Sequence, residues 1–123
     1  MNGISIVCDT NPLLYLLDGD KSLARFLGNK QIYLSVMTEL ELFGKKNLSA
    51  HESEMIDALL VNCFIVGINQ EIKHIYRELK RKYAVKLPDA VIAATALYLD
   101  LPLLTFDQDF KYIPNLKLMT WDH

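Results

Sequence analysis

Short apolar runs alternate along the chain with longer stretches that mix apolar and polar residues. Five of these runs are expected to form strands: residues 4–8, 31–35, 64–66, 103–105 and 116–119. The first, from Ile4 to Cys8, is almost uninterrupted and rich in β-branched residues. Such a run is typical of a strand that is buried on both faces of a sheet.

The stretches between these runs have the spacing of helices. The clearest contains apolar residues at helical intervals, namely Ile72, Ile75, Tyr76, Leu79 and Tyr83. Further helices are expected at residues 12–17, 23–27, 36–46, 50–60 and 90–98. Strands that alternate with helices predict an α/β fold with a largely parallel sheet covered on both faces.

The length and composition fit one folded domain. With 123 residues, 51% of them hydrophobic and 23% charged, the chain is expected to form a single domain over residues 1–123. The apolar run near the N-terminus follows no basic segment and stops at Asp9, and no apolar stretch approaches about 18 residues. We therefore expect a cytoplasmic protein without a signal peptide or a membrane span.

The net charge of −2 at pH 7 is not that of a typical nucleic-acid-binding protein. It argues against such a partner unless several acids gather around a cation. The cation then neutralises these acids, and they add no negative charge to the surface that faces a phosphate backbone. The interpretation of the charge therefore depends on where the acids lie.

Four acidic residues are expected at the carboxyl edge of the sheet. Asp9 directly follows the first strand, and Asp107 lies two residues beyond the strand that ends at Thr105. Asp89 lies in the first turn of the helix before that strand, and Glu41 lies early in the helix that leaves the second strand. Because α/β proteins bind ligands beyond the carboxyl ends of their strands, these carboxylates are expected to meet.

Stability alone would not assemble four carboxylates. At about 5 Å and an effective dielectric constant near 20, each like-charged pair costs about 3 kcal/mol. A hard divalent cation offsets this repulsion, and a ligand set of carboxylates suits Mg²⁺ or Mn²⁺ better than zinc. Such a cation activates water and stabilises charge on a phosphate, so the pattern indicates metal-dependent phosphodiester hydrolysis.

Each acid also has a purely structural interpretation. Asp9 could cap the helix that follows the first strand, and Glu41 could close a capping box with Thr38. Asp89 is favoured in a first helical turn by the helix dipole, and Asp107 could be a turn residue. The inference of a site therefore depends on the common location of the four acids.

Four segments of the sequence resemble the motifs of PIN-domain nucleases. They lie at residues 7–17, 34–42, 87–96 and 102–110, in the order and spacing of that family. The resemblance covers about residues 4–120 and is closest to the compact VapC-like toxins of bacterial toxin–antitoxin pairs. It implies a three-layer α/β/α fold with a central five-stranded parallel sheet.

The resemblance also implies a function. The chain would be an endoribonuclease that uses Mg²⁺ or Mn²⁺ to hydrolyse RNA, and it would form a homodimer bound by an antitoxin protein. The acids of the family fall, by position, on Asp9, Glu41, Asp89 and Asp107. Supporting polar positions of the metal pocket fall on Thr10, Asn11 and Thr105.

Two of the acid assignments have competitors. Glu39 lies two residues before Glu41, and a helix directs the two side chains about 200° apart, so only one can face the site. We favour Glu41, which would occupy about the third helical position. Asp107 competes with Asp109, and we favour Asp107 because it lies nearer the end of its strand.

Basic residues could bind the RNA phosphates. The candidates are Lys45, Lys46, Arg77, Lys80 and Arg81. The last three belong to a basic cluster that ends at Lys86, and the alternative is that this cluster is only the solvated face of its helix.

Two other protein classes with acids at strand ends are disfavoured. A phosphoacceptor receiver domain needs an aspartate after its third strand, where this chain has residues 66–68, Val-Gly-Ile. A haloacid-dehalogenase-like phosphatase needs Asp-x-Asp, where residues 9–11 are Asp-Thr-Asn. The remaining alternative is a catalytically silent PIN scaffold that binds RNA or a protein partner.

Overall fold

The computed structural model describes residues 3–121, and of Thr120 it describes only the backbone. Its elements, in chain order, are β1 (Ser5–Cys8), α1 (Thr10–Leu17), α2 (Lys21–Leu27), β2 (Gln31–Ser35), α3 (Val36–Phe43), α4 (Ala50–Val61), β3 (Phe64–Val66), α5 (Gln70–Lys82), α6 (Leu87–Leu99), β4 (Leu103–Thr105), the 3-10 helix η1 (Gln108–Tyr112) and β5 (Leu118–Thr120). The predicted domain limits of 1–123 include residues 1–2 and 122–123, which lie outside this description, and the single domain stays a prediction. None of the described helices has the length and apolar character needed to cross a membrane.

The five strands form one parallel sheet in the order β3-β2-β1-β4-β5. Strand β1 lies at the centre, with Val7 in register with Tyr33 of β2 and Leu103 of β4. The predicted five-stranded parallel sheet is therefore confirmed. Because all five strands run the same way, their carboxyl ends lie along one edge.

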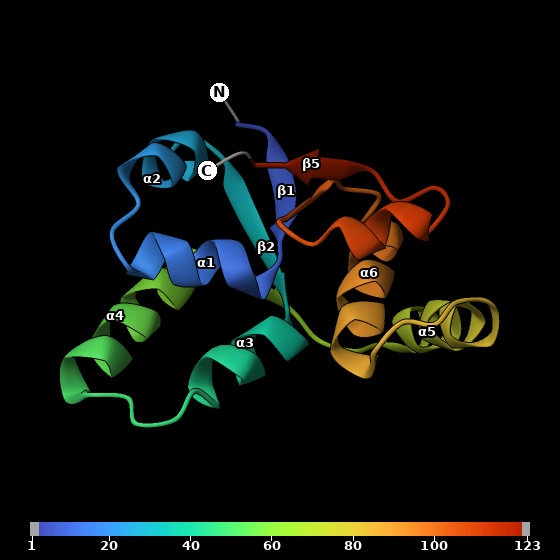
Figure 1. The fold of residues 1–123 in the computed structure, drawn as a ribbon, viewed down its shortest axis with the longest axis horizontal. Coiled ribbons are helices and arrows are strands. Elements are labelled where there is room, and N and C mark those ends of the chain that lie inside the picture. The colour runs from blue at the N-terminus through green and yellow to red at the C-terminus, as the bar shows by residue number, and fades with distance from the viewer. Residues whose placement is uncertain (1–2, 122–123) are drawn as a thin grey trace.

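Helices cover both faces of the sheet, which confirms the predicted three-layer α/β/α fold. In Figure 1, α1, α2 and α4 lie on one side of the strands, and α5 and α6 lie on the other. Alternate residues of β1 supply the two cores: Ile6 packs with the buried side chains of the first group, and Val7 packs with those of α5 and α6. Both residues are fully buried, as expected for an inner strand.

Several boundaries differ from those expected, and helices α1, α2 and α6 each begin two or three residues earlier than predicted. Helix α3 ends at Phe43 rather than at residue 46, because Gly44 forms its C-cap. Strand β5 begins at Leu118, two residues later than expected. The segment after β4, where a turn at Asp107 was one alternative, contains η1, whose N-cap is Asp107.

Candidate active site

All four predicted acids line one open pocket of about 330 Å³ at the carboxyl edge of the sheet. Its lining residues are Asp9, Thr10, Asn11, Leu14, Glu41, Lys45, Asp89 and Asp107. They come from the residue after β1, the first two turns of α1, the first turn of α6, helix α3 and the segment that follows it, and the segment after β4. Figure 1 shows the N-terminal ends of α1 and α3 next to the carboxyl ends of β1 and β2. We call this hollow the acid pocket.

Asp9 is the most buried of the four acids, with 6% of its surface exposed. It is the N-cap of α1: its Oδ1 accepts a hydrogen bond from the backbone N–H of Thr10 at 2.8 Å. Its Oδ2 accepts a hydrogen bond from the hydroxyl of Thr105 at 2.7 Å. Burial raises the pKa of Asp9, these hydrogen bonds partly oppose the rise, and the charges of Glu41 and Asp107 add to it. The capping interpretation is thus correct, and the same side chain also lines the pocket.

Glu41 lies in the acid pocket but not at the helical position expected for it. Ser35 ends β2 and is itself the N-cap of α3, with its hydroxyl accepting from the backbone N–H of Met37 at 3.0 Å. Glu41 is therefore in the second turn of the helix, and the suggested capping box with Thr38 is wrong because Thr38 lies inside α3. Glu41 Oε1 accepts a hydrogen bond from the Thr10 hydroxyl at 2.6 Å.

The competitor Glu39 lies in the first turn of α3. It is not among the residues that line the acid pocket. The lining of the pocket therefore favours Glu41. It does so although Glu41 lies in the second turn of α3 and not at the third helical position that the sequence suggested.

Asp89 is in the first turn of α6, after Pro88. Its pKa is raised from 3.8 to about 6, first by partial burial and then by the charges of Asp9, Asp107 and Glu41. The charge of Lys86 opposes this rise. Three acids that come from separate segments therefore act on the fourth, so the four carboxylates form one electrostatic group.

Asp107 lines the acid pocket, whereas Asp109 does not. The backbone N–H of Asp107 donates to the Thr105 hydroxyl at 3.0 Å, and its own Oδ1 accepts from the backbone N–H of Asp109 at 2.8 Å. Asp107 thus caps η1, as a turn residue would, and it also faces the site. The geometry favours Asp107 as the fourth acid.

The comparisons with known proteins agree with this arrangement. The family model of the PIN domain matches residues 6–116, a range that contains all four acids. The chain belongs to the PIN domain family. A search among curated proteins gives no match.

Solved structures of similar fold come from toxin–antitoxin complexes. A chain of a toxin–antitoxin complex from Klebsiella pneumoniae is 32% identical, with a TM-score of 0.79 over 94% of this chain and 96% of that one. A chain of VapBC-1 from nontypeable Haemophilus influenzae is 26% identical, with a TM-score of 0.78 over 96% and 98%. A chain of DNA-bound VapBC2 from Rickettsia felis is 24% identical, with a TM-score of 0.83 over 97% and 100%. The predicted resemblance to VapC-like PIN domains is confirmed.

The donor set of this PIN domain fits a hard divalent cation in its chemistry. Within residues 3–121, no three His, Cys, Asp or Glu side chains stand close enough to hold a metal ion as they are arranged here. Asp9, Glu41 and Asp107 each accept a hydrogen bond from a nearby group instead. Four carboxylates that repel one another in one pocket are nevertheless the ligand type that Mg²⁺ and Mn²⁺ prefer.

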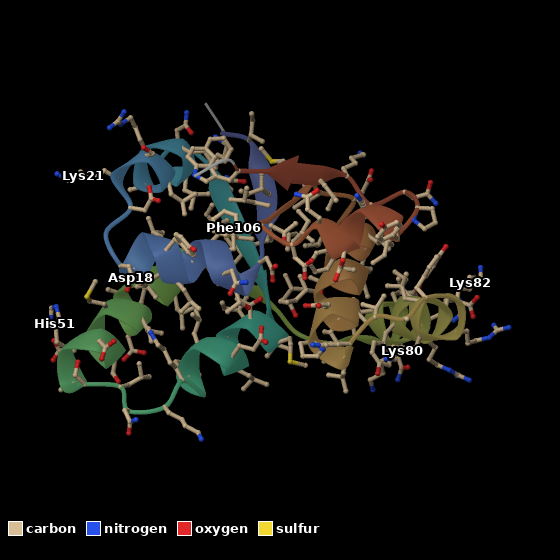
Figure 2. All side chains as sticks on the ribbon, in the orientation of Figure 1. Asp18, Lys21, His51, Lys80, Lys82 and Phe106 are labelled. Atoms are coloured by element: carbon tan, nitrogen blue, oxygen red, sulfur yellow. The ribbon has the colours of Figure 1, made fainter. Side chains whose placement is uncertain are left out.

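The predicted basic residues do not gather at one place. Lys45 lines the acid pocket, and Lys46 is exposed beyond the end of α3. Arg77 is exposed on α5. In Figure 2, Lys80 and Lys82 lie on α5, at the far side of the molecule from α1. Lys80 donates to the backbone carbonyl of Val85, and Arg81 pairs with Glu78 at 2.8 Å.

A second pocket of about 470 Å³ adjoins the acid pocket, and sequence reasoning missed it. Its lining residues are Tyr83, Ala84, Val85, Lys86, Asp89, Asp107, Asp109, Phe110, Tyr112 and Ile113. They belong to the connection between α5 and α6, the first turn of α6 and the region of η1. Apart from Tyr83, which continues the helical pattern of α5, the lining residues follow no periodic pattern. The one available signal was Lys86, which lies one helical turn before Asp89.

Proposed function

We propose that this PIN domain is a metal-dependent endoribonuclease and the toxin of a toxin–antitoxin pair. The observation that carries the proposal is the acid pocket, in which partial burial and then the charges of Asp9, Asp107 and Glu41 raise the pKa of Asp89 to about 6. An uncompensated cluster of this kind is costly, and a functional site is the usual reason for such a cost. Membership of the PIN family and the similarity to toxin–antitoxin complexes support the same function.

The four carboxylates would hold Mg²⁺ or Mn²⁺. When bound, such a cation activates a water molecule and stabilises negative charge on the scissile phosphate. Hydroxyl groups orient these carboxylates. The Thr105 hydroxyl donates a hydrogen bond to Asp9 and accepts one from the backbone N–H of Asp107, and the Thr10 hydroxyl donates a hydrogen bond to Glu41. Such hydrogen bonds to the ligand carboxylates fix the orientation of these carboxylates before the cation binds.

The substrate would be RNA, held by its phosphates. Lys45 supplies positive charge at the acid pocket, and the neighbouring Lys46 is exposed to solvent. Arg77, Lys80 and Arg81 on α5 would extend the contacts with the phosphate backbone. Asn11 lines the acid pocket as a further polar group.

The partners would be an antitoxin protein and a second copy of the chain, in the cytoplasm. On α1, Tyr15 is 42% exposed, whereas Leu13 is buried and Leu14 is half-buried against the core. Large apolar side chains are exposed elsewhere. They include Leu40 and Phe43 on α3, and Phe64 on β3.

A specific observation keeps the catalytically silent PIN scaffold as the second candidate. The acids share a pocket, but among residues 3–121 no three metal-binding side chains are arranged to hold an ion. A scaffold that only binds RNA or a protein partner would need no such arrangement. The two candidates differ in whether RNA is cut.

The experiment compares cleavage of labelled RNA in Mn²⁺ or Mg²⁺ with cleavage in EDTA. We expect cleavage only with the metal, and we expect Asp9→Asn to lose at least about 100-fold, because it removes one ligand charge at nearly constant shape. Asp57→Asn, on the exposed surface of α4, is the matched control and should cleave like the unmodified protein. Cleavage that survives both EDTA and Asp9→Asn would contradict the proposal, and RNA binding without any cleavage would favour the scaffold.

A further inference from the structure

The second pocket lies directly beside the acid pocket, so one ligand could occupy both. The two hollows share Asp89 and Asp107 in their linings. Its volume of about 470 Å³ lies within the range of ~300–1,000 Å³ that is typical of pockets for small ligands. A nucleotide bound with its phosphate in the acid pocket would therefore have a cavity beside it.

Three of the residues that line the second pocket are aromatic. Phe110 is only 2% exposed and packs in the core beneath α5 and α6, so it forms a fixed wall. Tyr83 is half-buried and packs against the same core. Tyr112, in contrast, is 67% exposed. Its ring thus leaves a large apolar surface in solvent beside the pocket, although an aromatic ring is costly to expose.

Positive charges stand beside these aromatic rings. Lys86 lines the second pocket, and its charge acts on Asp89 of the acid pocket. Lys111 places its Nζ 5.3 Å from the centroid of the Tyr112 ring. Aromatic rings combined with nearby lysines match the two parts of a nucleotide, since bases stack on rings and phosphates attract cations.

We propose that the second pocket binds an unpaired base of the RNA, next to the scissile phosphate, and that this base stacks on Tyr112. We call it the base pocket. A base can turn out of its stack and onto a side chain only when it is not paired with another base. The preferred substrate is therefore single-stranded or looped RNA. The inference depends on the proposed function, because it takes the scissile phosphate to lie in the acid pocket. Tyr112 is then a positioning residue that selects where the RNA is cut.

The first test measures RNA binding, which does not depend on cleavage. A labelled single-stranded RNA of mixed sequence is titrated with the protein in Ca²⁺, and binding is followed by fluorescence anisotropy. We expect Tyr112→Ala to weaken binding on the order of tenfold, as for the loss of one stacked base, and Tyr112→Phe to restore it. Because Tyr112 is mostly exposed, neither change should alter the fold, and circular dichroism checks this.

The matched control is Tyr98→Ala. Tyr98 is also exposed, at 43%, but it lies near the C-terminal end of α6, nine residues from Asp89 and therefore about 13 Å along the helix. It should bind RNA like the unmodified protein. Equal binding by Tyr112→Ala and the unmodified protein would overturn the inference, whether or not the protein cleaves RNA. Equal weakening by Tyr98→Ala would also overturn it, because the effect would then not belong to the pocket.

The second test locates the base. Once the cut positions in an RNA are mapped, each nucleotide that flanks a cut is replaced in turn by an abasic one. At one of the two positions, the missing base should lower kcat/KM by about the same factor as Tyr112→Ala, and the two changes together should cost no more than either alone. Independent losses at both positions would contradict the base pocket while leaving the nuclease activity intact. A protein that cuts no RNA would instead refute the proposed function, and the binding test would still decide on the base pocket.

Discussion

At the scale of single residues, Thr105 connects two of the acids. Its hydroxyl donates to Asp9, which follows β1, and accepts from the backbone N–H of Asp107, which follows β4. Thr105 is fully buried, so it makes both hydrogen bonds out of reach of solvent. The spacing of Asp9 and Asp107 is thereby fixed by neighbouring strands of the sheet rather than by mobile side chains.

Substitution of the two glutamates of α3 tests which of them serves the site. Glu41→Gln keeps an oxygen that can accept from Thr10 but removes the charge that a hard cation requires. We expect it to abolish metal-dependent cleavage, while the melting temperature without metal stays level or rises because repulsion is relieved. Glu39→Gln, the matched control, should keep most of the activity. An inactive Glu39→Gln together with a normal Glu41→Gln would reverse the assignment.

The raised pKa of Asp89 predicts how stability depends on pH in the absence of metal. Because this pKa is about 6 in the folded chain and near 3.8 when unfolded, the folded state binds more protons between these values. The free energy of unfolding should therefore fall as the pH rises from about 5 to about 7. Asp89→Asn removes this contribution, so the variant should become more stable than the unmodified protein as the pH increases.

The measurement for this prediction is the melting temperature in EDTA at several pH values. The stability of the unmodified protein also depends on Asp9, whose pKa burial raises, and on Glu52 and Glu78, whose pKa values are lowered by hydrogen bonds. The unmodified protein and the variant both contain these three groups. The difference between Asp89→Asn and the unmodified protein then isolates Asp89. A difference that stays constant over this range would show that the folded chain does not raise the pKa of Asp89.

At the scale of elements, sequence patterns predicted the inner strands and most helices because periodicity and caps are local. The strands at 31–35, 64–66 and 103–105 were predicted with their correct limits. The helix expected at residues 50–60 is present as α4, and a capping box of Ser49 and Glu52 marks its start. Errors arose where one residue serves two elements. Ser35 ends β2 and also caps α3, so the helix begins at Val36 as expected, but Thr38 is not its cap and Glu41 lies in the second turn.

The same contrast applies to the site. The four acids could be predicted because Asp9 and Asp107 follow strands, and Asp89 and Glu41 lie on helices next to strands, so the sheet brings them to one edge. The base pocket could not be predicted, because Tyr83 at the end of α5 and Tyr112 at the end of η1 are far apart in the sequence. Their meeting depends on how the α5–α6 connection and η1 fold over the end of α6. Local patterns do not encode that arrangement.

At the scale of the whole molecule, exposed apolar side chains indicate where copies of the chain would meet. Strand β3 is one edge of the sheet, and Phe64 and Ile65 on it are 52% and 37% exposed. Helix α3 contacts β3 and exposes Leu40 and Phe43 by 55% and 49%. Exposed apolar surface on an unprotected edge strand is a liability for a monomer unless a partner covers it.

We therefore predict a homodimer that uses α3 and β3. Light scattering at micromolar concentration should give about twice the 14.1 kDa of one chain. Phe43→Lys and Phe64→Lys place a charge on the apolar surface and should shift the mass to that of the monomer, because an unpaired charge is costly to bury. Met55→Lys on α4, where the native side chain is 37% exposed, adds the same charge elsewhere and should leave the dimer intact. A monomer mass for the unmodified protein would contradict the dimer, and a dimer that survives both phenylalanine substitutions would place its interface on another surface.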